Sequence, residues 1–160
     1  WLEAVIVNTF TYNADGPRVK IENNEGTSKI IWDGQQYLAE TDGSDTTTVA
    51  YTNTPAAFTN LISQRKDGTT IWLHFDALGS MRQATNISEI VTDTAIYEAW
   101  ENIVSQTGTT PIVFLWNGQH GYFYNIDTGD HYVIERIDDP VTARWMSLEP
   151  IVFSSATFTD

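Results

Sequence analysis

The chain has 160 residues, of which 41% are hydrophobic and 12% aromatic, so it is long enough to bury a core within one domain. Its formal net charge of −13 disfavours binding to nucleic acid or to anionic membrane surfaces, because both contacts need basic side chains. It has no cysteine and no long apolar run, which excludes disulfides, thiolate catalysis, cysteine-ligated metals and a membrane-spanning helix.

The first half of the sequence predicts short strands separated by tight turns. Residues 13–17 (NADGP) form one turn, because Asn and Asp tolerate left-handed conformations and Gly adopts positive φ. Residues 33–34 and 66–68 are typical of hairpin turns, whereas residues 41–46 and 53–60 form longer connections. The strands expected here cover residues 4–12, 18–22, 29–32, 36–40, 47–52, 61–65 and 70–75.

The second half continues the same pattern. Residues 97–102 would suit a helix in isolation, but their β-branched flanks favour a turn followed by a strand. About 13 to 15 short strands in all, with a turn roughly every 8 to 12 residues, favour a sandwich, a barrel or a β-solenoid. No helix pattern or linker intervenes, so we expect residues 1–160 to form one all-β domain. The strands expected here cover residues 81–85, 90–96, 103–106, 112–116, 119–124, 131–137, 144–146 and 151–153.

Short internal repeats decide among these architectures. Residues 12–16 (YNADG), 75–79 (FDALG) and 97–101 (YEAWE) each combine an aromatic, an acidic or amide residue, and then Ala. Residues 32–35 (WDGQ) recur as residues 116–119 (WNGQ). Because these repeats are degenerate and unevenly spaced, they predict a winding antiparallel sheet of many short strands better than a regular propeller.

An ordered set of segments resembles the RHS-repeat, or YD-repeat, proteins. Residues 28–120 resemble the family's repeats, through stretches such as residues 31–42 (IWDGQQYLAETD) and 74–80 (HFDALGS). Residues 121–151 resemble the RHS-associated core, with an aromatic-rich run, Asp-Thr-Gly at residues 127–129, and then D-P-x-T-x-R-W-x-S-x-x-P-I. Together these segments span most of the chain in the family's order.

The resemblance implies that the repeats wind into a hollow β-shell and that the core segment closes one end of it. Such shells belong to secreted or surface proteins, among them bacterial toxins and the adhesive teneurins of animals. Many bacterial members cut themselves at a motif beyond the core. That motif does not occur before Asp160, so we assign no autoproteolysis and no processing role to Asp139 or Asp160.

Thirteen residues of the repeats and the core form the structural signature of the resemblance, and none is expected to be catalytic. We expect Tyr122, Tyr124, Tyr132 and Trp145 to pack, Asp139-Pro140 to turn the chain, and Arg136 and Arg144 to partner acidic turns. This sequence departs from the family at Ala143, Glu149 and Val152, at Ile134, where Arg is common, and at Asp138, where an aromatic is usual. The full set is Tyr97, Trp116, Gly118, Tyr122, Tyr124, Gly129, Tyr132, Arg136, Asp139, Pro140, Arg144, Trp145 and Pro150.

No catalytic, cofactor or metal site is expected. The three histidines, His74, His120 and His131, lack metal-ligand spacing, and we interpret the last two as polar turn residues. Residues 42–45 and 127–130 could each contact calcium weakly, but they lack the pattern of known calcium loops. No nucleophile motif or defined carboxylate pair is present, so we expect no enzymatic activity. The tryptophans Trp32, Trp72, Trp100, Trp116 and Trp145 are expected in the core, with a weak glycan contact as the alternative.

Three functional hypotheses follow. The first is a non-enzymatic structural module of a secreted or cell-surface RHS protein, completed at its sheet edges by the rest of the parent shell. The second is an extracellular subunit whose identical copies join edge to edge into a filament. The third is a carbohydrate-binding module or glycoside hydrolase. A chain this short is not expected to close a shell alone, and Trp1 is taken as a mature, processed or truncated end.

Overall fold

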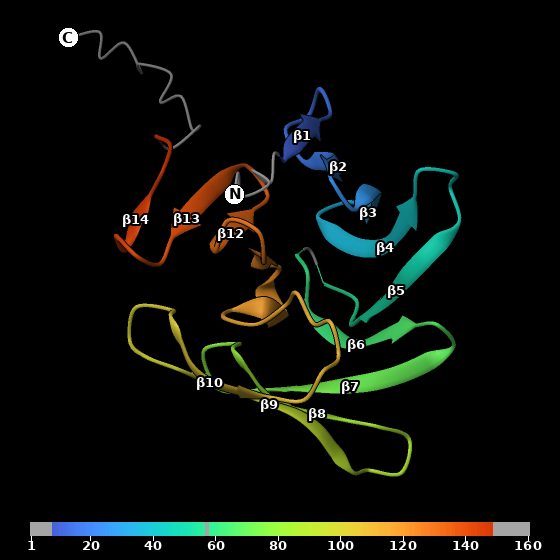
Figure 1. The fold of residues 1–160 in the computed structure, drawn as a ribbon, viewed down its shortest axis with the longest axis vertical. Coiled ribbons are helices and arrows are strands. Elements are labelled where there is room, and N and C mark those ends of the chain that lie inside the picture. Colours follow the sequence, from blue (N-terminus) through green and yellow to red (C-terminus); the bar gives the residue numbers. More distant parts are fainter. Residues whose placement is uncertain (1–7, 57, 149–160) are drawn as a thin grey trace, which may run out of the picture.

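The computed structural model describes residues 8–56 and 58–148, and the regular elements of this described part are strands, apart from one short 3₁₀ helix (Figure 1). Ten strands follow one another as an antiparallel meander in the order of the chain. The all-β prediction and the winding antiparallel sheet are therefore confirmed. The ten strands are β1 (Thr9–Tyr12), β2 (Arg18–Asn23), β3 (Gly26–Asp33), β4 (Gln36–Asp42), β5 (Thr47–Asn53), β6 (Leu61–Lys66), β7 (Thr69–Phe75), β8 (Met81–Thr85), β9 (Val91–Tyr97) and β10 (Ile103–Thr107).

Five of the connecting turns share one backbone geometry. In each, the first residue donates its N–H to the carbonyl of the fifth, and the fourth donates its N–H to the carbonyl of the first. The fourth residue always has positive φ. In four turns the Asn or Asp that begins the turn also accepts a backbone N–H with its side chain. The turns begin at Asn13, Asp42, Asp76, Asn86 and Glu98, so all three five-residue repeats noted in the sequence are copies of one turn.

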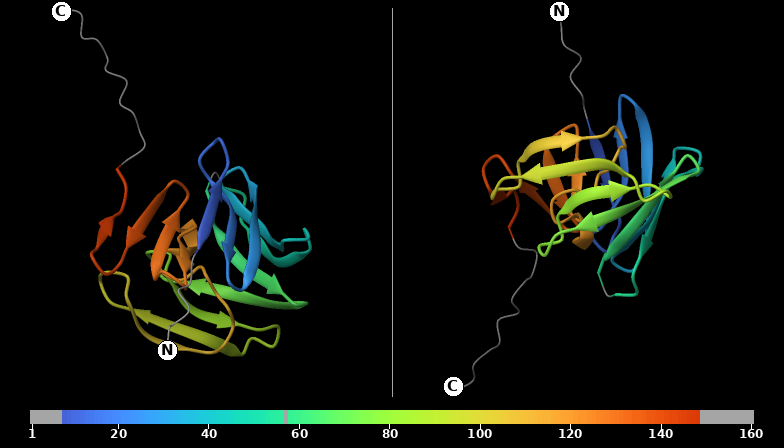
Figure 2. Two further views of the ribbon diagram at one scale, coloured as in Figure 1. Left: turned by 45° about the horizontal axis from the view of Figure 1, so that its top comes forward. Right: turned by 90° about the horizontal axis from the view of Figure 1, so that it is seen from below.

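The ten-stranded sheet curls strongly, and a second sheet covers its open side. The second sheet has four strands in the order β11 (Phe123–Asn125), β12 (Asp130–Val133), β13 (Arg136–Asp139) and β14 (Arg144–Trp145). In Figures 1 and 2 it lies between the first strands and the last strands of the large sheet. Every strand of both sheets pairs antiparallel with its neighbour along the chain.

The segment between the sheets, residues 108–117, runs through the interior of the curl (Figure 1). Phe114 is fully buried there, with its ring 4.9 Å from that of Tyr37, 5.1 Å from Tyr51 and 5.7 Å from Phe123. A short 3₁₀ helix, η1 (Gly118–His120), then leads to the second sheet. The core is thus an aromatic cluster enclosed by both sheets, and such clusters supply most of the apolar burial of a small domain.

The inner segment corrects one expected strand, residues 112–116. Its backbone forms isolated hydrogen bonds to several elements, including Met81 N–H to Leu115 O and Tyr124 N–H to Val113 O, at 2.9 and 2.8 Å. These bonds do not form a ladder, so the segment is extended without being a strand. An apolar run of five residues predicts burial but does not by itself specify a paired strand.

Two further strand predictions are corrected and two lie outside the described residues. The expected strand over residues 119–124 is divided between η1 and β11, because Gly121 has φ +88 and ends the 3₁₀ turn. The expected strand over residues 131–137 is a hairpin, because Ile134 adopts φ +53 and reverses the chain between β12 and β13. Of the expected strand 4–12, only residues 9–12 are observed as β1, and residues 4–7 and 151–153 are not described.

Candidate functional site

The place where the second sheet joins the two ends of the large sheet is the candidate functional site. Arg18, the first residue of β2, forms the first junction and is completely buried. Its guanidinium lies 4.0 Å from the ring centre of Phe10 and 3.9 Å from that of Tyr132, which belongs to β12. Its Nη1 donates a 2.8 Å hydrogen bond to Asn125 Oδ1 on β11, and Asn125 donates in turn to Asp130.

The backbone reinforces this first junction. The N–H of Arg18 donates a 2.5 Å hydrogen bond to the Tyr132 hydroxyl, which donates to the carbonyl of Ile134. Further along the same hairpin, Asn23 Nδ2 donates to Asp127 Oδ2 at 2.9 Å. A charged side chain buried without a carboxylate is costly unless aromatic faces and amide oxygens replace its hydration. Arg18 therefore fixes the first hairpin on the second sheet at one defined position.

Glu101 forms the second junction, in the turn between β9 and β10. Its Oε2 lies 3.2 Å from Nδ1 of His131, and both side chains are largely buried, at 19% and 2% exposure. Asp138 on β13, 8% exposed, lies beside the same pair. The neighbouring Asn102 donates to the carbonyl of Pro140 at 3.4 Å. Three titratable side chains from the large sheet's last turn and from two strands of the second sheet thus meet in one buried cluster.

The cluster shifts the pKa values of its carboxyl groups in opposite directions. Burial, followed by the hydrogen bond to Glu101, raises the pKa of Asp138 to about 6. Burial also opposes ionisation of Glu101, but hydrogen bonds to His131 and Asp138 outweigh it and lower the pKa of Glu101. Two adjacent buried carboxyl groups do not ionise independently, so one proton shared with Asp138 allows Glu101 to remain charged.

Aromatic contacts surround this junction. The rings of Tyr122 and Tyr124 lie 6.4 and 5.3 Å from the His131 ring, measured between ring centres. Trp116 packs edge-on against Tyr97, the last residue of β9, at 5.6 Å. Burial, together with the charges of Glu101 and Asp138, raises the pKa of Tyr122. The junction is therefore a polar cluster held within an aromatic layer.

No family model matches the chain. Among curated proteins, it is 25% identical over 144 residues to a Bacillus spizizenii protein named tRNA3(Ser)-specific nuclease WapA. That match covers 89% of this chain and 6% of the Bacillus protein. The chain therefore spans a small part of this relative.

Solved structures of Tc toxin proteins share the architecture. The crystal structure of TcdB2-TccC3 matches 89% of this chain with a TM-score of 0.64 and 13% identity. A structure of the Photorhabdus luminescens Tc holotoxin pore matches 94% with a TM-score of 0.64 and 12% identity. In both cases the match covers 8% of the other chain. The chain has an RHS-related fold.

The nuclease relative contradicts the expectation that no enzyme is involved. The Bacillus protein is named as an enzyme, so the absence of a catalytic motif in these 160 residues is no basis for excluding enzymatic activity from the protein. The expectation was wrong because the absence of a recognised motif does not exclude enzymatic activity. The filament hypothesis gains no support, since each matched structure contains this fold as a small part of a long chain.

Within the RHS-related fold, part of the core signature lies in the second sheet and its turns. Tyr132 is buried at the first junction, while Arg136 lies with its guanidinium 4.0 Å from the ring centre of Trp145. Asp139 accepts hydrogen bonds from the Val141 N–H and the Thr142 hydroxyl. Its backbone stands opposite that of Arg144 in the β13–β14 ladder. Pro140 is buried, and Gly129, with φ +75, lies in the turn between β11 and β12.

The remaining members lie around η1 or outside the described part. Gly118 is buried, and a Cβ there would lie 2.9 Å from Cβ of Phe114, so the inner segment leaves no room for a side chain. Tyr97, Trp116, Tyr122 and Tyr124 surround the second junction. Pro150 lies outside the described residues.

Sequence reasoning missed Arg18, Glu101 and the roles of His131 and Asp138. His131, expected in a turn, is a buried residue of β12, because β11 and β13 flank that strand on both sides. Two signals were available in the sequence. Glu101 stands where two other copies of the repeated turn have Gly, and Asp138 stands where the RHS family has an aromatic.

The tryptophan prediction holds for two of the five residues. Trp32 and Trp116 pack against the core cluster. Trp100, at 65% exposure, and Trp145, at 39%, lie at the surface, because Trp100 occupies a turn and Trp145 belongs to the last described strand, β14. Trp72 is half-buried and lies at a surface hollow.

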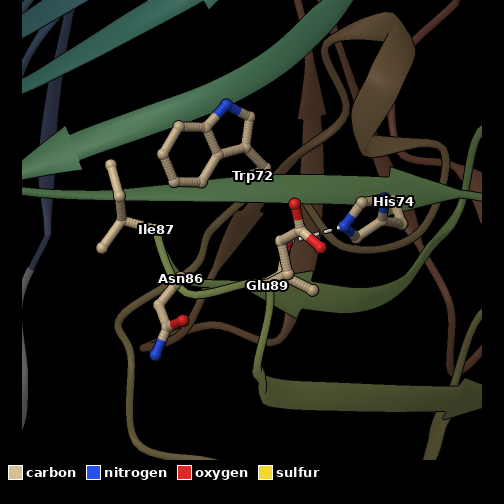
Figure 3. Close-up of a pocket in the computed structure, with 6 residues that line it drawn as sticks. Trp72, His74, Asn86, Ile87 and Glu89 are labelled. Atoms are coloured by element: carbon tan, nitrogen blue, oxygen red, sulfur yellow. Dashed lines mark hydrogen bonds between the residues drawn. The ribbon is translucent and has the colours of Figure 1, made fainter.

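The hollow lies over β7, β8 and the turn that follows β8 (Figure 3). Its volume is about 320 Å³, and Figure 3 shows its side chains around one opening. His74 shares a 2.9 Å hydrogen bond with the hydroxyl of Thr85. Glu89 is exposed at φ +60 in the turn. The hollow is lined by Trp72, His74, Thr85, Asn86, Ile87 and Glu89.

Two other kinds of site were sought in the described part of the chain. No three His, Asp or Glu side chains among residues 8–56 and 58–148 are arranged to hold a metal ion. The acidic loops at residues 42–45 and 127–130 form tight turns there. No described helix has the length and apolar character needed to span a membrane.

Proposed function

We propose that this chain is a segment of the β-shell of a larger secreted or cell-surface RHS-type toxin. In this proposal residues 28–120 are the repeat wall and residues 121–151 are the core that closes it. The thirteen signature residues hold the core in place. The parent protein belongs with toxin enzymes such as the tRNA nuclease that the chain resembles.

The observation that carries this proposal is the bridge formed by the second sheet. Arg18 anchors it to the first hairpin, and Glu101 anchors it to the last turn of the same wound sheet. The two anchors lie 83 residues apart in the sequence, so the second sheet holds together ends of the wall that only the curl brings near each other. A core segment that closes one end of a shell has to contact distant parts of the shell in this way.

The sheet edges support a continuing wall. Among the described residues, β1 and β10 each pair on one side only. An unpaired edge offers backbone donors and acceptors that natural proteins cover or pair. We propose that the neighbouring part of the parent shell pairs with the outer edge of β1 and continues the meander.

Electron cryo-microscopy of the full-length parent protein tests this proposal. The expected map contains a hollow shell in which a strand from another part of the chain pairs with β1. The second sheet lies across the wall as in the isolated segment. A map in which this segment is a separate domain on a linker, with β1 unpaired, would contradict the proposal.

A glycan contact is the second candidate function, and the hollow at Trp72 favours it. An exposed aromatic face beside amide, imidazole and carboxylate groups suits the apolar and polar faces of a sugar ring.

The test is nuclear magnetic resonance titration with N-acetylglucosamine and methyl β-glucoside. Shifts confined to the hollow that disappear in Trp72→Ala support this function. Trp100→Ala removes an exposed tryptophan elsewhere and is the matched control. No shift with either sugar, or equal loss in both variants, would contradict it.

A further inference from the structure

Two copies of the repeated turn have a glutamate at the fourth position, where the backbone has positive φ and a glycine would be unstrained. Glu89 and Glu101 occupy the fourth position of their turns at φ +60 and +74, whereas Gly16 and Gly79 hold that position in two other copies. Positive φ places the Cβ of an ordinary residue close to its own backbone, which is unfavourable for every residue except glycine. Glu89 is exposed, whereas Glu101 reaches the buried cluster. Strain that is kept at a defined contact suggests that the contact has a role.

The contact made by Glu101 joins the wall to the core hairpin. Oε2 of Glu101 and Nδ1 of His131 lie 3.2 Å apart, within ion-pair distance, and both side chains are largely buried. Asp138 belongs to the same buried cluster, because it stands directly opposite His131 in the β12–β13 ladder and is 8% exposed. With Asp138 protonated, the cluster holds one carboxylate and a hydrogen-bond donor facing it. With Asp138 ionised, two carboxylates meet in a buried place and repel each other.

We propose that Glu101, His131 and Asp138 form a pH-sensitive clasp that holds the β12–β13 hairpin to the last turn of the wall more tightly in mildly acidic than in neutral or alkaline solution. The clasp deepens the proposed function and rests on it, because its role is to regulate how firmly the core closes the wall. The residues that face Glu101 or Asp138 from other positions are Trp116, Tyr122 and Asp139, and Arg136 faces Tyr122.

The direction of the pH dependence follows from the two carboxyl groups. The pKa of Asp138 is raised from 3.8 to about 6 in the folded protein, so its contribution is fully present below about pH 3.8 and is lost as pH rises through about 6. The pKa of Glu101 is lowered from 4.5, so its contribution is present above that value and is lost as pH falls through the lowered pKa. The clasp is therefore tightest near pH 4.5, weakens as pH rises towards about 6, and is weakest at and above pH 7.5.

Asp138→Asn tests the clasp directly, because the amide donates to Glu101 without acquiring a charge. Thermal unfolding of the chain is measured at pH 5.5 and 7.5 for the wild type and the variant. We expect the variant to melt at a higher temperature than the wild type at pH 7.5, by roughly 2–4 °C. We also expect its melting temperature to change less between the two pH values. Asp33→Asn, which removes an exposed carboxyl group at the end of β3, is the control and should keep the wild-type pH difference.

A pair of glycine variants separates the clasp from backbone strain. Glu89→Gly relieves strain in an exposed turn and should raise the melting temperature equally at both pH values. Glu101→Gly relieves the same strain but removes the clasp, so it should lower the melting temperature at pH 5.5 and weaken the pH dependence. Equal effects of the two variants, or a wild-type pH difference in Asp138→Asn, would overturn the clasp. These measurements use the chain itself, whereas the shell proposal is tested by microscopy of the parent protein. Either proposal can therefore be contradicted without the other.

Discussion

At the scale of single residues, Arg18 is the side chain whose role depends most on its chemical type. Two aromatic rings, Phe10 and Tyr132, lie 4.0 and 3.9 Å from its guanidinium, and Asn125 accepts one of its N–H groups. A planar guanidinium stacks on rings and donates at the same time, which an ammonium group does not. Position 18 therefore requires an arginine and not merely a positively charged side chain.

We predict that Arg18→Lys lowers the free energy of unfolding by about 2 kcal/mol, because stacking and the Asn125 hydrogen bond are both weakened. Urea denaturation monitored by tryptophan fluorescence measures this change. Arg65→Lys, at an exposed position of β6, is the matched control and should change it by less than about 0.5 kcal/mol. Equal effects at the two positions would show that the stacked geometry contributes nothing specific.

Gly108 is a second residue whose identity is fixed by its surroundings. It has φ +87, and a Cβ there would lie 2.1 Å from Asp93 Oδ1 and 2.6 Å from the backbone oxygen of Thr92. Asp93 is buried and accepts hydrogen bonds from both the N–H and the hydroxyl of Thr110. The glycine thus lets the chain leave β10 and enter the interior of the curl.

We predict that Gly108→Ala destabilises the chain by at least about 1 kcal/mol more than Gly68→Ala. Gly68 has φ +77 with open space around it, so both variants share the backbone strain and only Gly108→Ala adds a clash. Urea denaturation of the two variants gives the difference. Equal destabilisation would mean that the loop moves aside at little cost.

At the scale of the elements, the repeated five-residue turn is the unit that winds the sheet. Asp76 shows how its first residue works, since its Oδ1 accepts the N–H groups of Leu78 and Ser80 and its Oδ2 accepts Nε of Arg82. Burial is the largest single effect and opposes ionisation, but these hydrogen bonds and the charge of Arg82 together outweigh it and lower the pKa of Asp76. Asn86 performs the same capping in the next turn without a charge.

We predict that Asp76→Asn preserves this turn, whereas Asp76→Ala costs about 1–2 kcal/mol of stability at pH 7. Because the folded pKa of Asp76 is lowered, its charge contributes stability above about pH 3.8 that is lost as pH falls through the folded value. Asp76→Asn should therefore lose less stability than the wild type on acidification. Thermal unfolding from pH 7 to pH 3 measures both effects, and an unchanged acid dependence in Asp76→Asn would contradict the account.

At the scale of the whole molecule, the ten-stranded sheet has a stable centre and exposed ends. Strands β5 to β8 are paired on both sides and cover the aromatic core, whereas β10 has mainly exposed side chains and β1 only one partner strand. Opening free energies within a protein follow local burial and pairing. The ends of the wall are thus the parts that depend on added contacts.

We predict that backbone amides of β1 and β10 exchange with deuterium much faster than those of β6 and β7. Hydrogen exchange read by mass spectrometry measures this at peptide resolution. In the full-length parent, the amides of β1 should become as protected as those of the central strands, because the continuing wall pairs with its edge. Rapid exchange of β1 in the parent would contradict a continuous wall.

The sequence by itself determined the class of fold, most of the strands of the large sheet and the turns between them. These features depend on local chemistry, namely β-branched alternation and the Asn, Asp and Gly residues that set turn geometry. The three aromatic repeats predicted a winding sheet, and in the structure each of them forms the same turn with one hydrogen-bond pattern.

Only the tertiary structure decided which residues meet. The apolar run at residues 112–116 predicts burial, but its course through the curl depends on partners such as Met81 and Tyr124, distant in sequence. Arg18, Glu101, His131 and Asp138 look like ordinary surface residues in the sequence, and burial between the two sheets gives them their partners. Contacts between residues about 30 to 110 positions apart arise from the curl of the whole sheet, and local patterns carry no information about that curl.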